Sequence, residues 1–307
     1  MATVVHLWGL DGKPSIISPE SIALFWFLNE METKSDITVV FSNNTDLSPN
    51  QELPILKNGT KTICGFANIV SVLAPTKSAL ESALLQFAQD RIGTLTQYQL
   101  YLNRNNYDNF TRKLFAYLLE WPMWYNTPLK YRSLARQHCE TLGYFSHPDD
   151  ADHVEELGED DIDDMVQSKA YKLTKASKAR NQELLKSARF NLQFLNRLSD
   201  QLQSWFEARD KMRSSSSSST AATQIVPADF LLWANLLIQL ELPDGHLVRE
   251  HLNRALGSEK VTEIESECKR RSEYQNKIRV NLRDPSFSER GNAVMSAYYS
   301  LCRLAAL

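Results

Sequence analysis

The sequence predicts an α+β N-terminal domain followed by a larger all-α domain. Short apolar runs typical of strands are confined to the first seventy-odd residues, and helical periodicity fills most of the rest. The stretch 228–242 is apolar on every side of a helix, so it must be enclosed by protein or lipid. It is shorter than the ~20 apolar residues that span a bilayer. We therefore expect a central buried helix, capped by Asp229, and domain boundaries at 1–76 and 77–307.

The first domain is expected to contain a βαβ unit followed by a ββα unit. Ser18-Pro19-Glu20 is typical of a helix start, and Asn58-Gly59 of a tight hairpin turn. The expected elements are a strand at Val4–Trp8, a helix after Ser18, strands at Ile37–Phe41, after Leu53-Pro54 and at Lys61–Cys64, and a helix at Phe66–Leu73.

Composition excludes several classes of protein. The chain has 307 residues, 43% hydrophobic and 23% charged, with a net charge of −3, which gives no general attraction to nucleic acid or acidic lipid. The four cysteines are scattered (Cys64, Cys139, Cys268, Cys302), which argues against a zinc site or a disulfide framework. We find no metal ligand set, no catalytic triad, no secretory signal and no segment of membrane-spanning length.

The stretch Trp121–Leu129, WPMWYNTPL, combines two prolines with three large aromatic residues. Pro122 and Pro128 are expected to prevent a continuous helix and to produce a bent connection. Its rings could pack into the helical domain. Alternatively, they could anchor a partner, because Trp and Tyr dominate interface hot spots. The candidate interface residues are Trp121, Trp124, Tyr125 and Leu129.

Two neighbouring segments carry opposite charge. Of the sixteen residues Asp149–Asp164, ten are acidic, so we expect an unstructured insertion near 147–167 that could attract a basic partner. Lys169–Arg213 holds eleven basic against four acidic residues and predicts a long amphipathic helix with a solvated basic face. No nucleic-acid motif accompanies it. A serine-rich loop near 213–226 follows. The apolar stripe of the helix is expected to be Leu185, Ala188, Leu192, Leu195, Leu202 and Trp205.

Two expectations concern the remaining helices. Asp244 is a candidate cap for a helix that ends at Leu256. The segment 285–307 has an apolar stripe and is expected to dock on the helical domain. The stripe comprises Val294, Met295, Tyr298, Leu301 and Leu304.

The order β-α-β then β-β-α, with a proline before the third strand, resembles the thioredoxin-like domain of glutathione S-transferases. The resemblance implies that Leu53-Pro54 is the cis-proline junction beside the glutathione site. In that family the last helix of the domain begins with an acid or amide followed by serine. Here Gly65 and Phe66 stand at those positions, so Leu53, Pro54, Gly65 and Phe66 mark a degenerate site.

A glutathione-dependent enzyme would have to use Ser15, Ser18 or Cys64, because no Tyr, Ser or Cys follows the first strand directly. Each residue has a simpler interpretation. Ser15 suits loop hydrogen bonding, Ser18 suits a helix cap, and Cys64 suits a buried inert thiol at a strand end. We expect no catalytic residue and no cofactor.

Several stretches resemble metaxin-type proteins, including the fungal metaxin-like subunit of the mitochondrial sorting and assembly machinery (the SAM, or TOB, complex). They are VHLWG, SPESIALFWFL, VFSNNTDLS, KLFAYLLEWPMWYNTPL, RFNLQFLNRL, LPDG and GNAVMS. The resemblance implies a non-enzymatic, peripheral subunit on the cytosolic face of the mitochondrial outer membrane. Its implied partners are a β-barrel channel subunit, a second metaxin-like subunit, β-barrel precursors and a receptor of the general import translocase.

Overall fold

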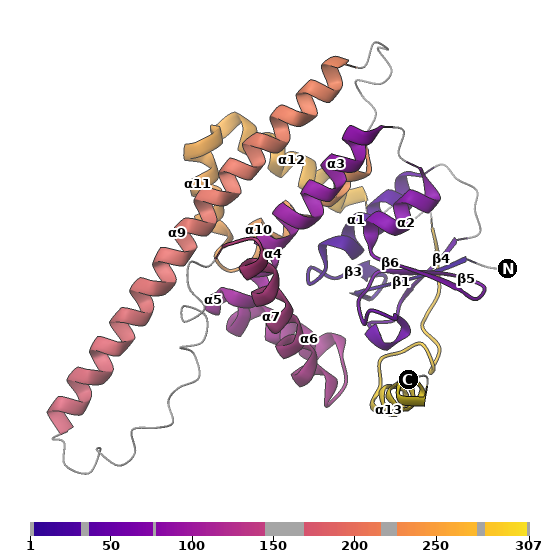
Figure 1. Cartoon of the computed structure of the whole chain (residues 1–307), viewed down its shortest axis with the longest axis horizontal. Coiled ribbons are helices and arrows are strands. Elements are labelled where there is room, and N and C mark those ends of the chain that lie inside the picture. Colours follow the sequence, from indigo (N-terminus) through magenta and orange to yellow (C-terminus); the bar gives the residue numbers. More distant parts are fainter. Residues whose placement is uncertain are drawn as a thin grey trace.

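The computed structural model of the chain describes residues 3–31, 37–75, 78–144, 169–215, 226–274 and 280–305. A mixed sheet with its helices lies beside a larger, mostly helical part (Figure 1). This layout is compatible with a glutathione S-transferase-like arrangement. The acidic insertion near 147–167 and most of the serine-rich loop near 213–226 lie outside the described residues.

Five strands form the main sheet. They are β1 (Thr3–Leu7), β4 (Ile37–Phe41), β5 (Ile55–Asn58), β6 (Lys61–Cys64) and β7 (Asn281–Leu282). The order is β6-β5-β1-β4-β7, with β1 parallel to β4 and antiparallel to β5, and β5 antiparallel to β6. The predicted βαβ unit and hairpin are thus confirmed. A separate small hairpin pairs β2 (Gly9–Leu10) with β3 (Lys13–Pro14).

Helix α1 (Pro19–Glu30) forms the crossover between β1 and β4. It begins as predicted: the Ser18 hydroxyl oxygen accepts from the Ser21 amide at 3.2 Å. α1 is buried along almost its whole length, because it packs on the sheet and on α10 (Pro227–Glu241). The rings of Phe27 and Phe230 meet edge to face between the two helices, with centroids 5.7 Å apart.

Helix α10 is the predicted buried centre of the helical part. Leu232 and Leu236, on one side of the helix, and Ile238, on another side, are all fully buried. Asp229 caps the helix as expected, since its carboxylate accepts from the Val226 amide at 3.1 Å. The same carboxylate forms a buried pair with Arg209, at 2.8 and 3.0 Å. Sequence patterns did not predict this pair.

Several further helices also pack against α10. A continuous helical run covers 79–102, where Gly93 adopts a helical φ of −59° and causes no break. The elements are η1 (Thr45–Leu47), α2 (Phe66–Leu73), α3 (Ala79–Phe87), η2 (Ala88–Ile92), α4 (Gly93–Gln97), η3 (Tyr98–Leu102), α5 (Arg104–Asn106), η4 (Tyr107–Thr111), α6 (Arg112–Leu118), α7 (Met123–Thr141), α9 (Lys169–Ser215), α11 (Gly245–Leu256), α12 (Ser258–Tyr274) and α13 (Ala293–Ala305). Of these elements, α3, η2, α4, α11 and α12 pack against α10.

The predicted bend at the two prolines is only half correct. Pro122 precedes α7, but Pro128 lies inside this helix, which continues to Thr141. Pro128 is in the second turn, close to the end where helix amides lack internal partners, so it removes one hydrogen bond without ending the helix. The side chains of Met123 and Trp124 pack against the core and support that turn.

The predicted apolar stripe of α9 is correct only in its C-terminal half. Leu195, Leu202 and Trp205 are buried, whereas Leu185 and Leu192 are 72% and 59% exposed, and Ala188 is exposed as well. The cause is visible in Figure 1, where the N-terminal half of α9 extends beyond the other helices. Helical spacing identifies an apolar face, but the other helices that the structure describes do not cover its whole length.

The prediction for the C-terminal segment is wrong. Instead of docking on the helical part, it returns to the N-terminal sheet, where β7 pairs in parallel with β4. The Arg283 amide donates to the Val39 carbonyl at 3.1 Å, and the Gly291 amide to the Ser42 carbonyl at 3.3 Å. Strand β4 is otherwise an edge with open hydrogen-bonding groups, which explains the pairing. The stripe residues Val294, Tyr298 and Leu301 on α13 are exposed.

Asp244 stands at the cap position of α11 but makes no side-chain cap hydrogen bond. Its carboxylate accepts instead from the side-chain amides of Asn103, at 2.8 Å, and Asn105, at 2.6 Å. The predicted role is therefore wrong, because two amide donors from a neighbouring loop compete for the carboxylate. These two hydrogen bonds connect the start of α11 to α5 and the residue before it.

Candidate functional site

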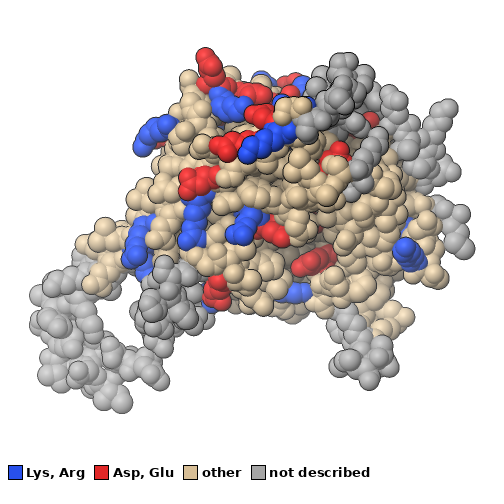
Figure 2. Space-filling model, turned by 45° about the horizontal axis from the view of Figure 1, so that its top comes forward, with Lys and Arg blue, Asp and Glu red and all other residues tan. Residues whose placement is uncertain are grey.

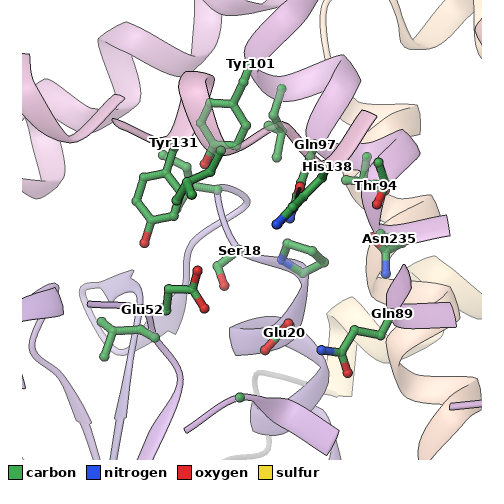
Figure 3. A pocket seen from close by; sticks show the side chains of 18 of the residues that line it. Ser18, Glu20, Glu52, Gln89, Thr94, Gln97, Tyr101, Tyr131, His138 and Asn235 are labelled. Atoms are coloured by element: carbon green, nitrogen blue, oxygen red, sulfur yellow. Dashed lines mark hydrogen bonds between the residues drawn. The ribbon is translucent and has the colours of Figure 1, made fainter. Parts of the chain in front are cut away.

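A cleft of about 500 Å³ lies where the N-terminal sheet region faces the helices (Figure 3). One wall comes from the residues around β1, the start of α1 and the β5–β6 hairpin. The other comes from the 79–102 run, α7 and α10. The volume is within the range of small-molecule sites.

Two of the four degenerate glutathione positions lie at this cleft, whereas Pro54 and Phe66 are buried and are not part of its lining. Leu53 and Gly65 line it, and the Leu53–Pro54 peptide bond is cis, as the resemblance implies. The Pro54 carbonyl accepts from the Gly65 amide at 2.9 Å. The Phe66 amide donates to a Glu20 carboxylate oxygen at 2.9 Å. The Glu20 side chain thus already accepts the hydrogen bond of the first backbone amide of α2.

Glu20 is the most perturbed acid of the cleft. Burial raises its pKa to about 7, the neighbouring Glu52 carboxylate adds to the rise, and the hydrogen bond from Phe66 opposes it. Glu20 therefore changes charge near neutral pH. A Glu directly after Ser-Pro predicts only a helix start, so no sequence pattern indicated that this residue would be a buried acid of the cleft.

The possible nucleophiles are placed in structural roles. The Ser15 hydroxyl oxygen accepts from the Ile17 amide at 3.4 Å within its loop, and Ser18 caps α1. Ser18 and Cys64 do line the cleft, and the Cys64 sulfur lies 3.4 Å from the Ser48 hydroxyl. No histidine hydrogen bond to any of these three residues is present among the described contacts.

Aromatic side chains form much of one wall. Tyr131 stacks on Tyr101 and Phe115, with centroids 5.7 and 6.0 Å apart, and the Trp8 ring meets Phe115 edge to face. Burial raises the pKa of both tyrosines well above the usual value, so their hydroxyls remain protonated at neutral pH. The wall is thus apolar with two neutral phenols.

Amide side chains that the sequence did not single out line the opposite wall. Figure 3 places Asn235, Gln89 and Thr94 together on one side, with Gln97 and His138 above. His138 Nδ1 lies 2.8 Å from the Gln97 side-chain oxygen. A usable signal was the presence of Asn235 inside the apolar α10 segment, because a polar residue in a buried helix needs a reason to be there.

The candidate partner-interface residues lie at the turn between α6 and α7 and in the first two turns of α7. Trp121 is 74% exposed, and Tyr125 and Leu129 are also exposed, whereas Trp124 is half-buried and packs against the core. Trp124 thus packs into the helical domain, whereas the role of the exposed residues in binding a partner stays a prediction. Tyr117, at the end of α6, is 76% exposed and extends the surface. We call Tyr117, Trp121, Tyr125 and Leu129 the aromatic surface.

One loop anchors both the aromatic surface and α13. The Asn43 side-chain amide donates to the Leu118 carbonyl at 3.4 Å, and that of Asn44 to the Arg290 carbonyl at 3.5 Å. The exposed apolar residues of α13 and the aromatic surface are therefore held by adjacent residues of one loop.

Charges elsewhere are mixed. Figure 2 shows basic and acidic side chains interspersed on the face in view, and several pair along α11 and α12, such as Arg249 with Glu265 and Arg270 with Glu267. On that face the interspersed signs form no extended basic patch. Within the described ranges, no group of three metal-ligating side chains occurs.

Comparison with models of known protein families shows to which family the chain belongs. The model described as an outer mitochondrial membrane transport complex protein matches residues 21–132, and the model of the Tom37 C-terminal domain matches residues 147–304. The second match alone covers just over half of the chain. The chain belongs to the Tom37 family. The search of curated proteins finds no match.

Membership in the Tom37 family makes the chain a component of a transport complex of the outer mitochondrial membrane. The metaxin-type resemblance is confirmed at this level. The Tom37 match at 21–132 contains α1 and the aromatic surface, and the C-terminal match contains α9 to α13. Across the parts of this Tom37-family chain that the structure describes, no helix is long and apolar enough to cross a bilayer.

Proposed function

We propose that this protein is a non-catalytic, peripheral subunit of the β-barrel assembly machinery (SAM/TOB complex), on the cytosolic face of the mitochondrial outer membrane. It caps the channel subunit beside a second metaxin-like subunit, aids maturation and release of β-barrel precursors, and couples the machinery to a receptor of the general import translocase. Its scaffold is glutathione S-transferase-like, with the boundary near residue 76.

The aromatic surface carries this proposal. Trp121 and Tyr125 expose most of their side chains at one turn, where solvation of large rings is unfavourable. Aromatic residues of this kind form the centres of protein interfaces. The turn is held firmly, because Pro128 and Trp124 pack beneath it. A rigid aromatic surface on a transport-complex component supports a contact with another subunit.

A physical reason exists for such a cap. A nascent barrel presents unpaired strand edges, which are costly in lipid until the barrel closes. A rigid subunit bound to the channel from the cytosolic side would stabilise the opened channel and favour release of the closed product. The acidic insertion near 147–167, outside the described residues, would attract basic segments of the receptor or precursor.

The test is the double substitution Trp121→Ala/Tyr125→Ala, with Val72→Ala as the matched control, since Val72 is also exposed but lies on α2. Loss of two hot-spot rings should reduce recovery of the channel subunit from detergent-solubilised mitochondria by about tenfold or more, and slow precursor release. The control should behave like the unmodified protein. Unchanged recovery and release in the double variant would contradict the proposal.

The location is tested in parallel by fractionation. The chain should sediment with mitochondria and be degraded by protease added outside intact organelles. Recovery wholly in the cytosol, or protection from the protease, would exclude the cytosolic face of the outer membrane.

A glutathione-dependent transferase is the alternative, and the cleft beside Leu53 is the observation in its favour. The carboxylates of Glu20, Glu52 and Asp90 in the lining disfavour an anionic tripeptide. Retention on immobilised glutathione together with turnover of an electrophile would support the alternative.

A further inference from the structure

The charges that line the cleft are of one sign. The described lining residues include three carboxylates, of Glu20, Glu52 and Asp90, and neither lysine nor arginine. Lys130 lies near the rim, but it donates to the Gln51 side chain and is not part of the lining. A cleft with low-dielectric walls concentrates the field of such carboxylates, so it attracts cations and repels anions.

An independent feature of the cleft is a buried acceptor without a protein partner. Asn235 is fully buried, its side-chain N–H donates to the Leu231 carbonyl at 2.7 Å, and its Oδ1 accepts from no donor among the described residues. The side-chain oxygen of Gln89 is also buried and accepts from no described donor. Both residues line the cleft on the side opposite Glu52 (Figure 3). Unpaired buried acceptors cost free energy that a ligand's N–H groups would recover.

We propose that the cleft binds a cationic nitrogen group, the guanidinium or ammonium of an arginine or lysine side chain in a basic peptide segment. Glu20 and Glu52 balance the charge, and the amide oxygens of Gln89 and Asn235 accept from the ligand's N–H groups. Apolar walls at Trp8 and Phe115 cover the aliphatic stem of such a side chain. The site goes beyond the assembly role, because the aromatic surface lies outside the cleft lining.

Binding of the cationic group should weaken as the pH falls below neutral. The pKa of Glu20 is about 7, so below neutral pH the carboxylate is protonated and loses its attraction for a cation. The other titratable groups that line the cleft are Glu52, Asp90, Cys64, Tyr101, Tyr131 and His138. The Glu20→Gln variant removes the titration of Glu20 and therefore tests whether this residue accounts for the pH dependence.

The experiment titrates the purified full chain with acetyl-Gly-Arg-Gly-amide and acetyl-Gly-Lys-Gly-amide at low salt, by calorimetry. The neutral isostere acetyl-Gly-citrulline-Gly-amide and spermidine are separate arms. We expect saturable binding of a basic peptide at pH 8, about tenfold weaker binding at pH 6, and no binding of the citrulline peptide. Saturation by spermidine with no binding of either peptide would overturn the assignment to a peptide.

Glu20→Gln and Glu52→Gln should each weaken binding about tenfold, which is the effect of removing one charged hydrogen-bonding partner. Glu120→Gln, at an exposed carboxylate outside the lining, should leave affinity unchanged. Glu52 is exposed, so its variant should fold even if Glu20→Gln weakens the start of α2. Equal affinity in Glu52→Gln and Glu120→Gln, or equal binding of arginine and citrulline peptides, would overturn the proposal. Because this assay contains no membrane and no other subunit, its failure would leave the assembly role untouched.

Discussion

Arg209 and Asp229 form a buried ion pair, with side chains only 4% and 9% exposed. Asp229 also accepts from the Val226 amide, so the pair joins α9 to the first turn of the central helix. Removal of one charge from such a pair leaves the other uncompensated in a low-dielectric site. Sequence patterns predicted the cap but not its partner, because Arg209 belongs to a run of basic residues that resembles a solvated face.

Arg209→Ala should lower the free energy of unfolding by about 3–5 kcal/mol, because the Asp229 carboxylate remains buried without its partner. Urea denaturation measures this change. Arg213→Ala, an exposed arginine four residues later, should stay within about 0.5 kcal/mol of the unmodified protein. A similar loss in both variants would mean that the pair contributes nothing specific.

The cleft residues show why a site of this kind escapes sequence interpretation. Glu20, Asn235 and Gln89 come from three elements, and no spacing links them. Taken alone, Glu20 indicates a helix start, Asn235 a polar residue in a helix, and Gln89 a surface amide. The positions Leu53 and Gly65 were predictable only because a family resemblance placed them beside one another.

Among the elements, strong local signals gave accurate predictions. β4, β6 and α2 have the expected bounds. Asn58-Gly59 marks the turn before β6, Pro75 follows the end of α2, and the Ser-Pro pair marks the start of α1. Strand β7 has two exposed residues and no apolar alternation, so nothing local predicted it. The open edge of β4 determines its position, and that edge exists only in the folded sheet.

Arg283→Pro should destabilise the β4–β7 pairing by about 1–3 kcal/mol relative to Arg283→Ala. Proline removes the amide that donates to Val39, whereas alanine keeps it, and both remove the ion pair with Glu289. Hydrogen exchange of β4 and β7 amides reports the loss. Identical exchange in the two variants would show that the pairing contributes no stability.

At the scale of the whole molecule, α1 and α10 unite the sheet with the helical part. The Arg271 guanidinium of α12 lies 4.6 Å above the Phe230 ring and 3.6 Å from the Glu30 carboxylate at the end of α1. Phe27 meets Phe230 from the other helix. Composition and pattern predicted two regions and a central helix, but the partners of that helix depend on packing that no single segment encodes.

Phe230→Ala should destabilise both regions together by about 3–5 kcal/mol, because it leaves a cavity at their shared contact. Amides of β1 and of α11 should lose protection from hydrogen exchange to the same extent. Phe287→Ala, at a ring 69% exposed, should have little effect. Loss of protection in only one region would mean that the two unfold independently.

The parallel pairing of β7 with β4 has a consequence for biogenesis. The 240 positions from Phe41, the end of β4, to Asn281, the start of β7, take on the order of tens of seconds to translate, so the outer edge of the sheet stays open for that time. In that interval the nascent chain presents a bare strand to any neighbour in the cytosol, and a chaperone that shields extended segments would be needed until residue 282 emerges.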